Sequence, residues 1–267
     1  MSEMRKQSVD MRAIRIAPPD NLKNIWVILK EPQTPGNIGS TARAMKGMGL
    51  TRLILVNPVP GWRESDQPWT FACWSHDILH NAIEVESLDE ILGEIHLLVG
   101  TTHRRRDPRL PEIIPAREGA KRIAGISRHH VVGVMFGRED FGLSTDDISR
   151  CHLCLSIPMA VRNPSLNLSH AVAIIAYEIL MASLEDIPSP ALDLPPANDL
   201  EALTDRITGL LKRTDFRPAN ENWDTLLYSI RRVLTRAQLE RRDIATLHLI
   251  FAHLEGFIRR RMRPKGV

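Results

Sequence analysis

The sequence predicts an α/β protein with a mainly parallel sheet that helices cover on both faces. Short runs rich in Val, Ile and Leu recur along the chain. Apolar and polar residues do not alternate in these runs, as they would in a strand with one face exposed to solvent. Segments of helical periodicity separate these runs, and glycine or polar residues follow most of them. Continuously apolar strands are typical of a parallel sheet that is buried on both faces. The 267 residues, of which 43% are hydrophobic, suffice for one sizeable core and a smaller module.

Strands and helices are predicted to alternate over the first two thirds of the chain. The strands are expected at 24–30, 53–58, 96–100, 131–136 and 153–157. The helices are expected at 38–48, 88–92, 115–126, 144–149 and 167–184. In the first helix Ala42, Met45 and Met48 recur at helical spacing, and Gly49 ends it. An irregular stretch that contains Trp and Pro is expected after the second strand.

The last third of the chain is predicted to form a separate helical module behind a linker. Residues 184–199 contain four prolines and few apolar residues that could pack. Helices are expected from Asp199 to Lys212, from Trp223 to Leu239 and from Asp243 onward. The expected organisation is an N-terminal extension (1–20), an α/β domain (21–183), a Pro-rich linker (184–199) and a helical basic module (200–267).

Positive charge is concentrated in this C-terminal module. The net charge of the whole chain is only +3, yet residues 200–267 hold 14 Lys and Arg residues against 8 Asp and Glu residues. Such asymmetry suggests a surface that faces a polyanion, although a solvated, charged helix face gives the same pattern. The charge alone leaves both interpretations open.

The sequence gives little support for a membrane-spanning segment, a disulfide framework or a metal site. No apolar run reaches the roughly 18 residues of a membrane helix, and the charged N-terminus lacks the apolar centre of a signal peptide. A cytoplasmic protein without a membrane partner is therefore expected. Cys151 and Cys154 form a C-x-x-C pair at the entry to an apolar run, but no second Cys/His pair has matching spacing. Buried structural cysteines and no bound metal are therefore expected, ahead of a zinc or redox site.

The first of three motifs that suggest chemistry is Thr34 to Gly49. Gly36 and Gly39 permit a tight turn after a strand, and Asn37 is suited to cap the helix that follows. Arg43 lies early in that helix, which begins at the strand's carboxyl end, where α/β proteins bind ligands. Neither the dinucleotide glycine fingerprint nor a phosphate loop is present. An ordinary strand–loop–helix connection with a surface arginine is the alternative.

The other two motifs also follow predicted strands. In Val134 to Ser144, Gly137 permits close backbone approach and the adjacent Arg138 and Glu139 carry opposite charges, although they could form an ordinary ion pair. In Leu155 to Ala171, Ser165 and Asn167 open a helix whose free N–H groups suit a ligand. Simple N-capping is the alternative for Ser165.

The three motifs, in this order, resemble those of the SpoU branch of the SPOUT RNA methyltransferases over about residues 24–182. The resemblance implies a deep trefoil knot, bound S-adenosylmethionine and a homodimer whose active site is completed across the interface. A helical tail behind a proline-rich linker is similar to that of bacterial enzymes that methylate the ribose 2′-hydroxyl in the anticodon loop of tRNA, at cytidine or uridine 32.

Site residues follow from the same resemblance. It implies catalytic roles for Arg43 and Ser165, with Asn37 and Glu139 shaping the site. The cofactor contacts it implies are Thr101, Thr102, Gly137, Ile157, Pro164, Ser165, Leu166 and Asn167. The RNA contacts expected are Arg43, Arg104, Arg105, Arg138 and Arg162.

The chemistry leaves the proton acceptor open. The family proposal makes Arg43 the base, but a guanidinium holds its proton very tightly and is better suited to clamp a phosphate and stabilise a forming alkoxide. Glu139 is the conventional candidate base if its geometry allows. Ribose methylation of rRNA or of another tRNA position is the nearest alternative function, and a non-catalytic RNA-binding protein on the same scaffold is another. The missing glycine fingerprint disfavours a nicotinamide-dependent dehydrogenase.

Overall fold

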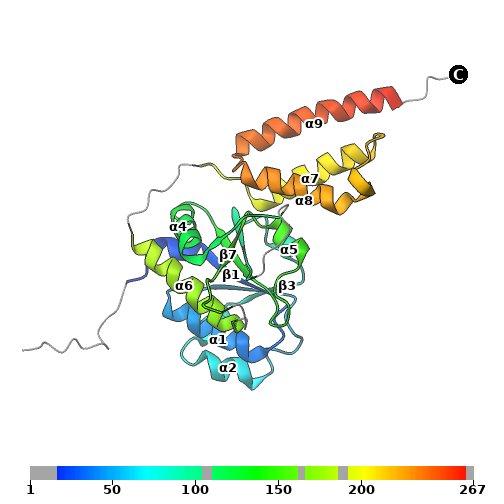
Figure 1. Ribbon diagram of the computed structural model, residues 1–267. Helices are drawn as coiled ribbons and strands as arrows, with labels where there is room; N and C mark the ends of the chain where they lie inside the picture. The colour runs from blue at the N-terminus through cyan, green and yellow to red at the C-terminus, as the bar shows by residue number, and fades with distance from the viewer. Residues whose placement is uncertain (1–16, 104–109, 162–165, 186–191, 263–267) are drawn as a thin grey trace, which may run out of the picture.

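A seven-stranded sheet forms the centre of the molecule in the computed structural model, which describes residues 17–103, 110–161, 166–185 and 192–262 (Figure 1). The strand order is β3-β2-β1-β6-β4-β7-β5, and every strand pair in the described residues is parallel. The strands are β1 (Ile25–Lys30), β2 (Arg52–Val56), β3 (Ile83–Val85), β4 (Leu97–Thr101), β5 (Ile113–Pro115), β6 (Val132–Phe136) and β7 (Leu153–Ser156). The five predicted strands are confirmed, whereas the short edge strand β5 and the short edge strand β3 were not predicted.

Successive residues of each central strand belong to two different hydrophobic cores. In β1, Ile25, Val27 and Leu29 join one core, while Trp26 and Ile28 join the other. This alternation follows from the two-residue side-chain period of a strand. Because both faces are covered, the strands are apolar throughout, and the predicted doubly covered α/β architecture is confirmed.

Helices cover the two faces of the sheet unequally. The larger core packs under α1 (Pro35–Gly47), α4 (Ala116–Ile126) and α6 (Leu168–Leu184), as the ribbon shows (Figure 1). The other core includes residues of the 3₁₀ turn η2 (Leu88–Glu90) and the short helix α5 (Thr145–Arg150). The segment predicted as a helix at 88–92 is therefore only a 3₁₀ turn, which a capping box at Ser87 starts.

The stretch expected to be irregular contains two short helices, α2 (Asp66–Ala72) and α3 (His76–His80). Ser65 caps α2 by accepting a hydrogen bond from the Gln67 amide. Helix α2 packs closely on α1, since a Cβ added to Gly39 would lie 2.1 Å from the Pro68 carbonyl oxygen. Glycine at position 39 thus lets the two helices meet, and this contact fixes the position of the first turns of α1.

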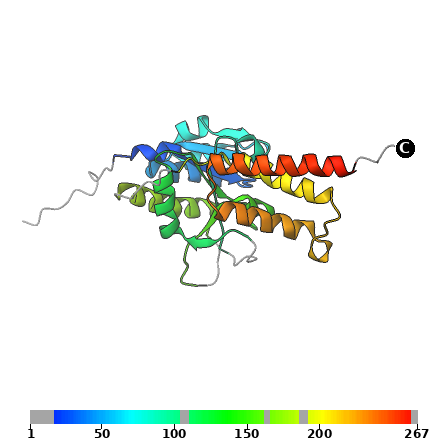
Figure 2. The ribbon, with the colours of Figure 1, turned by 90° about the horizontal axis from the view of Figure 1, so that it is seen from above.

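The C-terminal helices α7 (Ala197–Lys212), α8 (Trp223–Arg236) and α9 (Arg241–Met262) form a module with its own small core of Leu200, Leu203, Leu234 and Ile244. The three predicted helices are confirmed within a few residues. Figure 1 shows α9 on the side of the module that lies away from the sheet, and Figure 2 shows it extending past the α/β body. No helix of the described residues is long and apolar enough to span a membrane.

The described part of the proline-rich segment is packed on the α/β body. Leu194 is buried against the larger core, and the Leu192 carbonyl oxygen lies 2.7 Å from Nε2 of His130. The Ala197 amide donates to the Ile95 carbonyl at 2.7 Å. Residues 192–196 therefore anchor the module, although composition alone suggested a linker with little to pack.

The C-x-x-C pair belongs to the second core. Cys151 and Cys154 are fully buried free thiols, and burial raises the pKa of the Cys151 thiol. A Cβ on Gly100 would lie 2.9 Å from the Cys151 sulfur, so the thiols fill the space beside β4. The expectation of buried structural cysteines is confirmed.

A pH-dependent stability is expected from His152, which lies between α5 and β7. Burial lowers its pKa from 6.5 to about 4. Below about pH 6.5 the imidazole is therefore protonated in the unfolded chain but stays neutral in the native state. The free energy of unfolding consequently falls between about pH 6.5 and 4, by up to about 3 kcal/mol. Urea unfolding at pH 7.5 and 4.8 measures this loss. His152→Asn keeps an acceptor for the Leu98 amide and should reduce the pH dependence; an unchanged dependence would show that His152 is not responsible.

Candidate functional site

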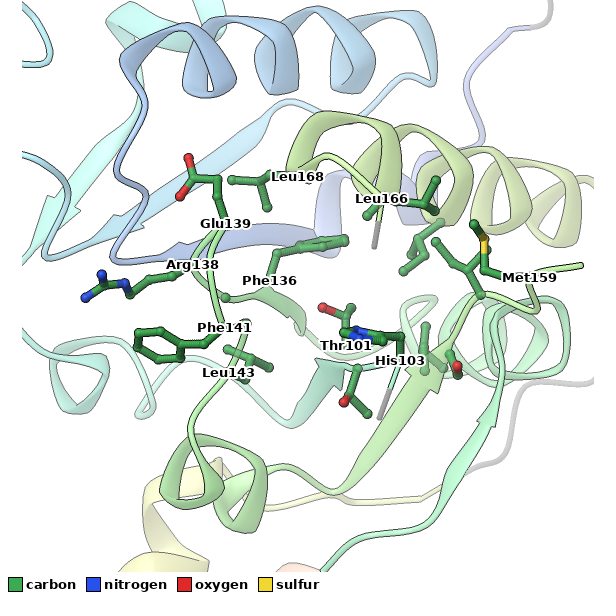
Figure 3. Close-up of a pocket in the computed structure, with 18 of the residues that line it drawn as sticks. Thr101, His103, Phe136, Arg138, Glu139, Phe141, Leu143, Met159, Leu166 and Leu168 are labelled. Carbon is green, nitrogen blue, oxygen red and sulfur yellow. The ribbon is translucent and has the colours of Figure 1, made fainter. Parts of the chain in front are cut away.

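A cavity of about 510 Å³ lies at the carboxyl ends of β4, β6 and β7 (Figure 3). Its walls come from the segments that follow these strands and from the first turns of α6. Apolar side chains such as Phe136, Leu155 and Ile157 line it together with polar groups such as Thr101. The size and the mixed lining suit a small organic ligand, and the position is the usual one for a parallel sheet.

The loop after β6 forms one wall of the cavity and folds back tightly on itself. Arg138 and Gly142 pair across the loop, where the Gly142 amide donates to the Arg138 carbonyl at 2.9 Å. A Cβ on Gly137 would lie 2.1 Å from the carbonyl carbon of Gly142. Only glycine fits at position 137, and Gly142 itself has φ of 75°, a conformation that glycine adopts without strain. The close approach expected from the second motif is present.

A chain of hydrogen bonds joins the three motifs beside this cavity. Asn37, on the first turn of α1, donates from Nδ2 to Oε1 of Glu139 at 2.9 Å. Asn167, which precedes α6, donates from Nδ2 to Oδ1 of Asn37 at 2.9 Å. Oδ1 of Asn167 accepts from the Ser169 amide and caps α6. Residues 37, 139 and 167, which are far apart in the sequence, thus fix one another's orientation.

The Glu139 carboxylate is held as an acceptor in this network. Besides Asn37, the backbone amides of Gln33 (3.0 Å) and Thr34 (3.1 Å) donate to it. Burial works to raise the pKa of Glu139, but these hydrogen bonds outweigh burial and lower it below its ordinary value. The carboxylate is therefore ionised and a weak base. The geometry favours a role in positioning Asn37 over a role as proton acceptor.

Arg43 lies apart from this cluster within one chain. It is exposed on α1, six residues and about 9 Å of helix rise beyond Asn37, and it does not line the cavity. Arg138 does line the cavity, but its guanidinium pairs with Asp140 at 2.8 Å and stacks over the Phe141 ring. Arg138 was expected to contact RNA, but in this structure its guanidinium contacts other side chains of the protein.

The predicted cofactor residues divide into three groups. Thr101, Thr102, Gly137, Ile157 and Leu166 line the cavity. Asn167 lies beside them in the hydrogen-bond chain. The cofactor residues Pro164 and Ser165 lie outside the described residues, as do the predicted RNA contacts Arg104, Arg105 and Arg162.

Several lining residues were not predicted from the sequence. They include Phe136, Phe141, Leu143, Met159, Val161 and Leu168. Their only signal in the sequence is that they follow strand ends, which does not distinguish them from core residues. Among the described residues, no group of three or more His, Cys, Asp or Glu side chains is arranged to hold a metal ion.

This fold is shared with a class of RNA methylases. The model of the SpoU rRNA methylase family matches residues 24–177, so the chain belongs to the SpoU methylase family. Two relatives are named tRNA (cytidine/uridine-2′-O-)-methyltransferase TrmJ. The protein of Pectobacterium atrosepticum is 37% identical over 245 residues, with 88% of this chain and 98% of that protein covered. The protein of Klebsiella pneumoniae is 37% identical over 241 residues, with 88% and 97% covered.

A solved structure shares the architecture over most of the chain. The crystal structure of TrmJ from Z. mobilis ZM4 superposes with a TM-score of 0.74 at 29% identity, covering 86% of this chain and 98% of that one. The similarity therefore extends from the α/β body into the C-terminal helices.

Proposed function

We propose that this protein transfers a methyl group from S-adenosylmethionine to the 2′-hydroxyl of a pyrimidine ribose in tRNA. The hydrogen-bond chain from Glu139 through Asn37 to Asn167, beside the cavity, is the observation that carries this proposal. These hydrogen bonds hold together the three sequence motifs on which the resemblance to the SpoU family rests. Relatives named tRNA (cytidine/uridine-2′-O-)-methyltransferases, which align over most of the chain, support the choice of substrate.

The cavity fits S-adenosylmethionine in size and chemistry. Its apolar lining from Phe136, Leu155 and Ile157 suits an adenine ring, and the strand-end segments at Thr101 and Gly137 offer polar backbone groups. When bound, the cofactor supplies an electrophilic methyl group on a sulfonium. We propose that Thr101, Thr102, Gly137, Ile157 and Leu166 hold it, together with Pro164 and Ser165.

The protein's own groups would then orient the ribose and stabilise charge. Alignment of the hydroxyl can supply roughly 7–11 kcal/mol of the barrier. Asn37, which Glu139 and Asn167 hold in place, is suited to contact the substrate near the cavity. Arg43 would clamp a phosphate and stabilise the developing alkoxide, because its guanidinium is a donor and a very poor base.

A homodimer would account for the distance between Arg43 and the cavity of its own chain. We propose that Arg43 acts in the site of a partner subunit. An exposed apolar stripe on α6, formed by Ile174, Tyr177, Met181 and Leu184, supports an interface of this kind. We also propose the deep trefoil knot that the resemblance to the SpoU enzymes implies. Work on tRNA would place the protein in the cytoplasm.

The proposed target is cytidine or uridine 32 of the anticodon loop, and methylation of rRNA or of another tRNA position is the alternative. Purified protein is incubated with methyl-labelled S-adenosylmethionine and tRNA, tRNA carrying 2′-deoxycytidine at position 32, or rRNA. Label on the first substrate alone supports the proposal. Label on the deoxy substrate moves the target to another position, and label on rRNA alone supports the rRNA alternative. Binding of tRNA without any transfer would point to a non-catalytic protein.

We propose that residues 21–183 form the catalytic domain and that the basic C-terminal module at 200–267, joined to it through 184–199, contacts tRNA phosphates. Arg259 and Arg260 are exposed near the end of α9. Replacing both with glutamine is expected to weaken tRNA binding and to lower the slope of log K against log salt by about 1–2, because fewer counterions are released. Filter binding across a salt series measures this slope. Lys121→Gln on α4 is the control, and an unchanged slope in the double variant would make the tail only a solvated surface.

A further inference from the structure

We infer that α8 positions the cofactor-binding loop, and that Arg231 is the positioning residue through which it acts. The inference rests on the proposed function, since it takes the cavity as the site of S-adenosylmethionine. It assigns to the C-terminal module a task besides contact with RNA, because the module would set the affinity for the cofactor.

Arg231 is a largely buried cation that joins the module to α5. Its Nη1 donates to Oδ1 of Asp146 at 3.1 Å and to Oγ of Ser149 at 2.8 Å. Its Nη2 donates to Oε2 of Glu201 on α7 at 2.9 Å. Only 11% of its side chain is exposed, so the charge depends on these partners. Removing one partner from a buried ionic group usually costs far more than losing a surface pair.

A second arginine extends the same network on α5 itself. Arg150 donates from Nε to the other carboxylate oxygen of Glu201 at 3.1 Å and pairs with Asp89 of η2. Three of the six residues of α5, at positions 146, 149 and 150, are therefore fixed by ionic or hydrogen-bond partners. A helix this short has little stability of its own, so tertiary contacts determine where it lies.

Helix α5 continues directly from the loop that lines the cavity. Ser144 caps α5 through a reciprocal pair of hydrogen bonds with Asp147. Leu143, the residue before the cap, is 1% exposed and lines the cavity. Tyr228, three residues before Arg231 on α8, packs against the core that contains Leu143 and Ile148. A shift of α5 would therefore move the wall that Gly142 and Leu143 form.

The affinity of the full chain for S-adenosylmethionine, measured by calorimetry without RNA, tests this inference. Arg231→Gln is expected to weaken binding by about tenfold, within the usual range of coupling between sites. Arg236→Gln removes an exposed charge from the same helix and should leave the affinity unchanged. Glu201→Gln breaks the network from α7, away from the cavity, and should weaken binding in the same direction if Arg231→Gln fails to fold.

Two further readouts separate positioning from a merely structural role. Hydrogen exchange in the absence of cofactor should become faster at residues 142–148 in Arg231→Gln. The KM for S-adenosylmethionine should rise, while the KM for tRNA at saturating cofactor stays the same. Unchanged cofactor affinity and unchanged exchange in both network variants would overturn the inference. If the unsubstituted chain bound no S-adenosylmethionine, the proposed function would fail, and the exchange experiment would still decide whether α8 holds the loop.

Discussion

Alanine at position 43 is expected to abolish methyl transfer to tRNA while leaving the affinity for S-adenosylmethionine within about twofold. Arg43 does not line the cavity, so its loss removes no cofactor contact. Loss of one group that stabilises developing charge typically costs 10²- to 10³-fold in rate, so kcat should fall by at least about 100-fold. Arg43→Lys keeps the charge but loses the planar fork, and an intermediate rate is expected.

Single-turnover transfer of labelled methyl groups measures the rate, and calorimetry measures the cofactor affinity. Lys46→Ala provides the matched control, because Lys46 is an exposed cation one turn further along α1 that pairs with Asp77. Its rate should be near that of the unsubstituted protein. Full activity in Arg43→Ala would remove Arg43 from the site, and an equal loss in Lys46→Ala would indicate a general charge effect on α1.

A single methyl group at position 137 is expected to weaken cofactor binding strongly. A Cβ there would lie 2.1 Å from the Gly142 carbonyl carbon and 2.2 Å from the Leu143 amide nitrogen, and both are backbone atoms that cannot rotate away. The loop must move as a whole, which opens the wall of the cavity. Gly137→Ala should weaken S-adenosylmethionine binding by more than about tenfold and cost about 1–3 kcal/mol of stability, as overpacking usually does.

Calorimetry and urea unfolding of Gly137→Ala test this expectation. Gly209→Ala on α7 is the matched control, because nothing lies within 4 Å of a Cβ at that position. Alanine in a helix interior is favoured over glycine, so this control should gain about 0.5–1 kcal/mol and bind the cofactor normally. Normal cofactor affinity in Gly137→Ala would show that the loop after β6 does not form the binding site.

The central strands could be predicted from the sequence because burial on both faces makes them apolar throughout. β3 and β5 escaped prediction because each has only three residues and lies at an edge of the sheet. Helix α2 has a readable start, with a serine cap at Ser65 and an acidic residue at Asp66, but the surrounding Trp and Pro residues obscured its periodicity.

The sequence predicted several residues of the candidate site, but not all of the contacts between them. The positions of Asn37, Glu139 and Asn167 after strands indicated that they would meet at one edge of the sheet, and the hydrogen bonds join them there. The separation of Arg43 from the cavity was not predictable, because its direction depends on how α1 is rotated against α2 and α6. The contact of Arg231 with Asp146 spans 85 residues of sequence and has no local signal.

The most direct test of the proposed function is mass spectrometry of nuclease fragments of the tRNA and rRNA from a strain that lacks this gene, because such fragments keep the position of each modification. We expect 2′-O-methylcytidine or 2′-O-methyluridine to disappear at one position of the anticodon loop of tRNA. The unsubstituted protein, but not Arg43→Ala, should restore the modification. An unchanged set of 2′-O-methylated nucleosides in the tRNA, or a loss confined to rRNA, would contradict the account.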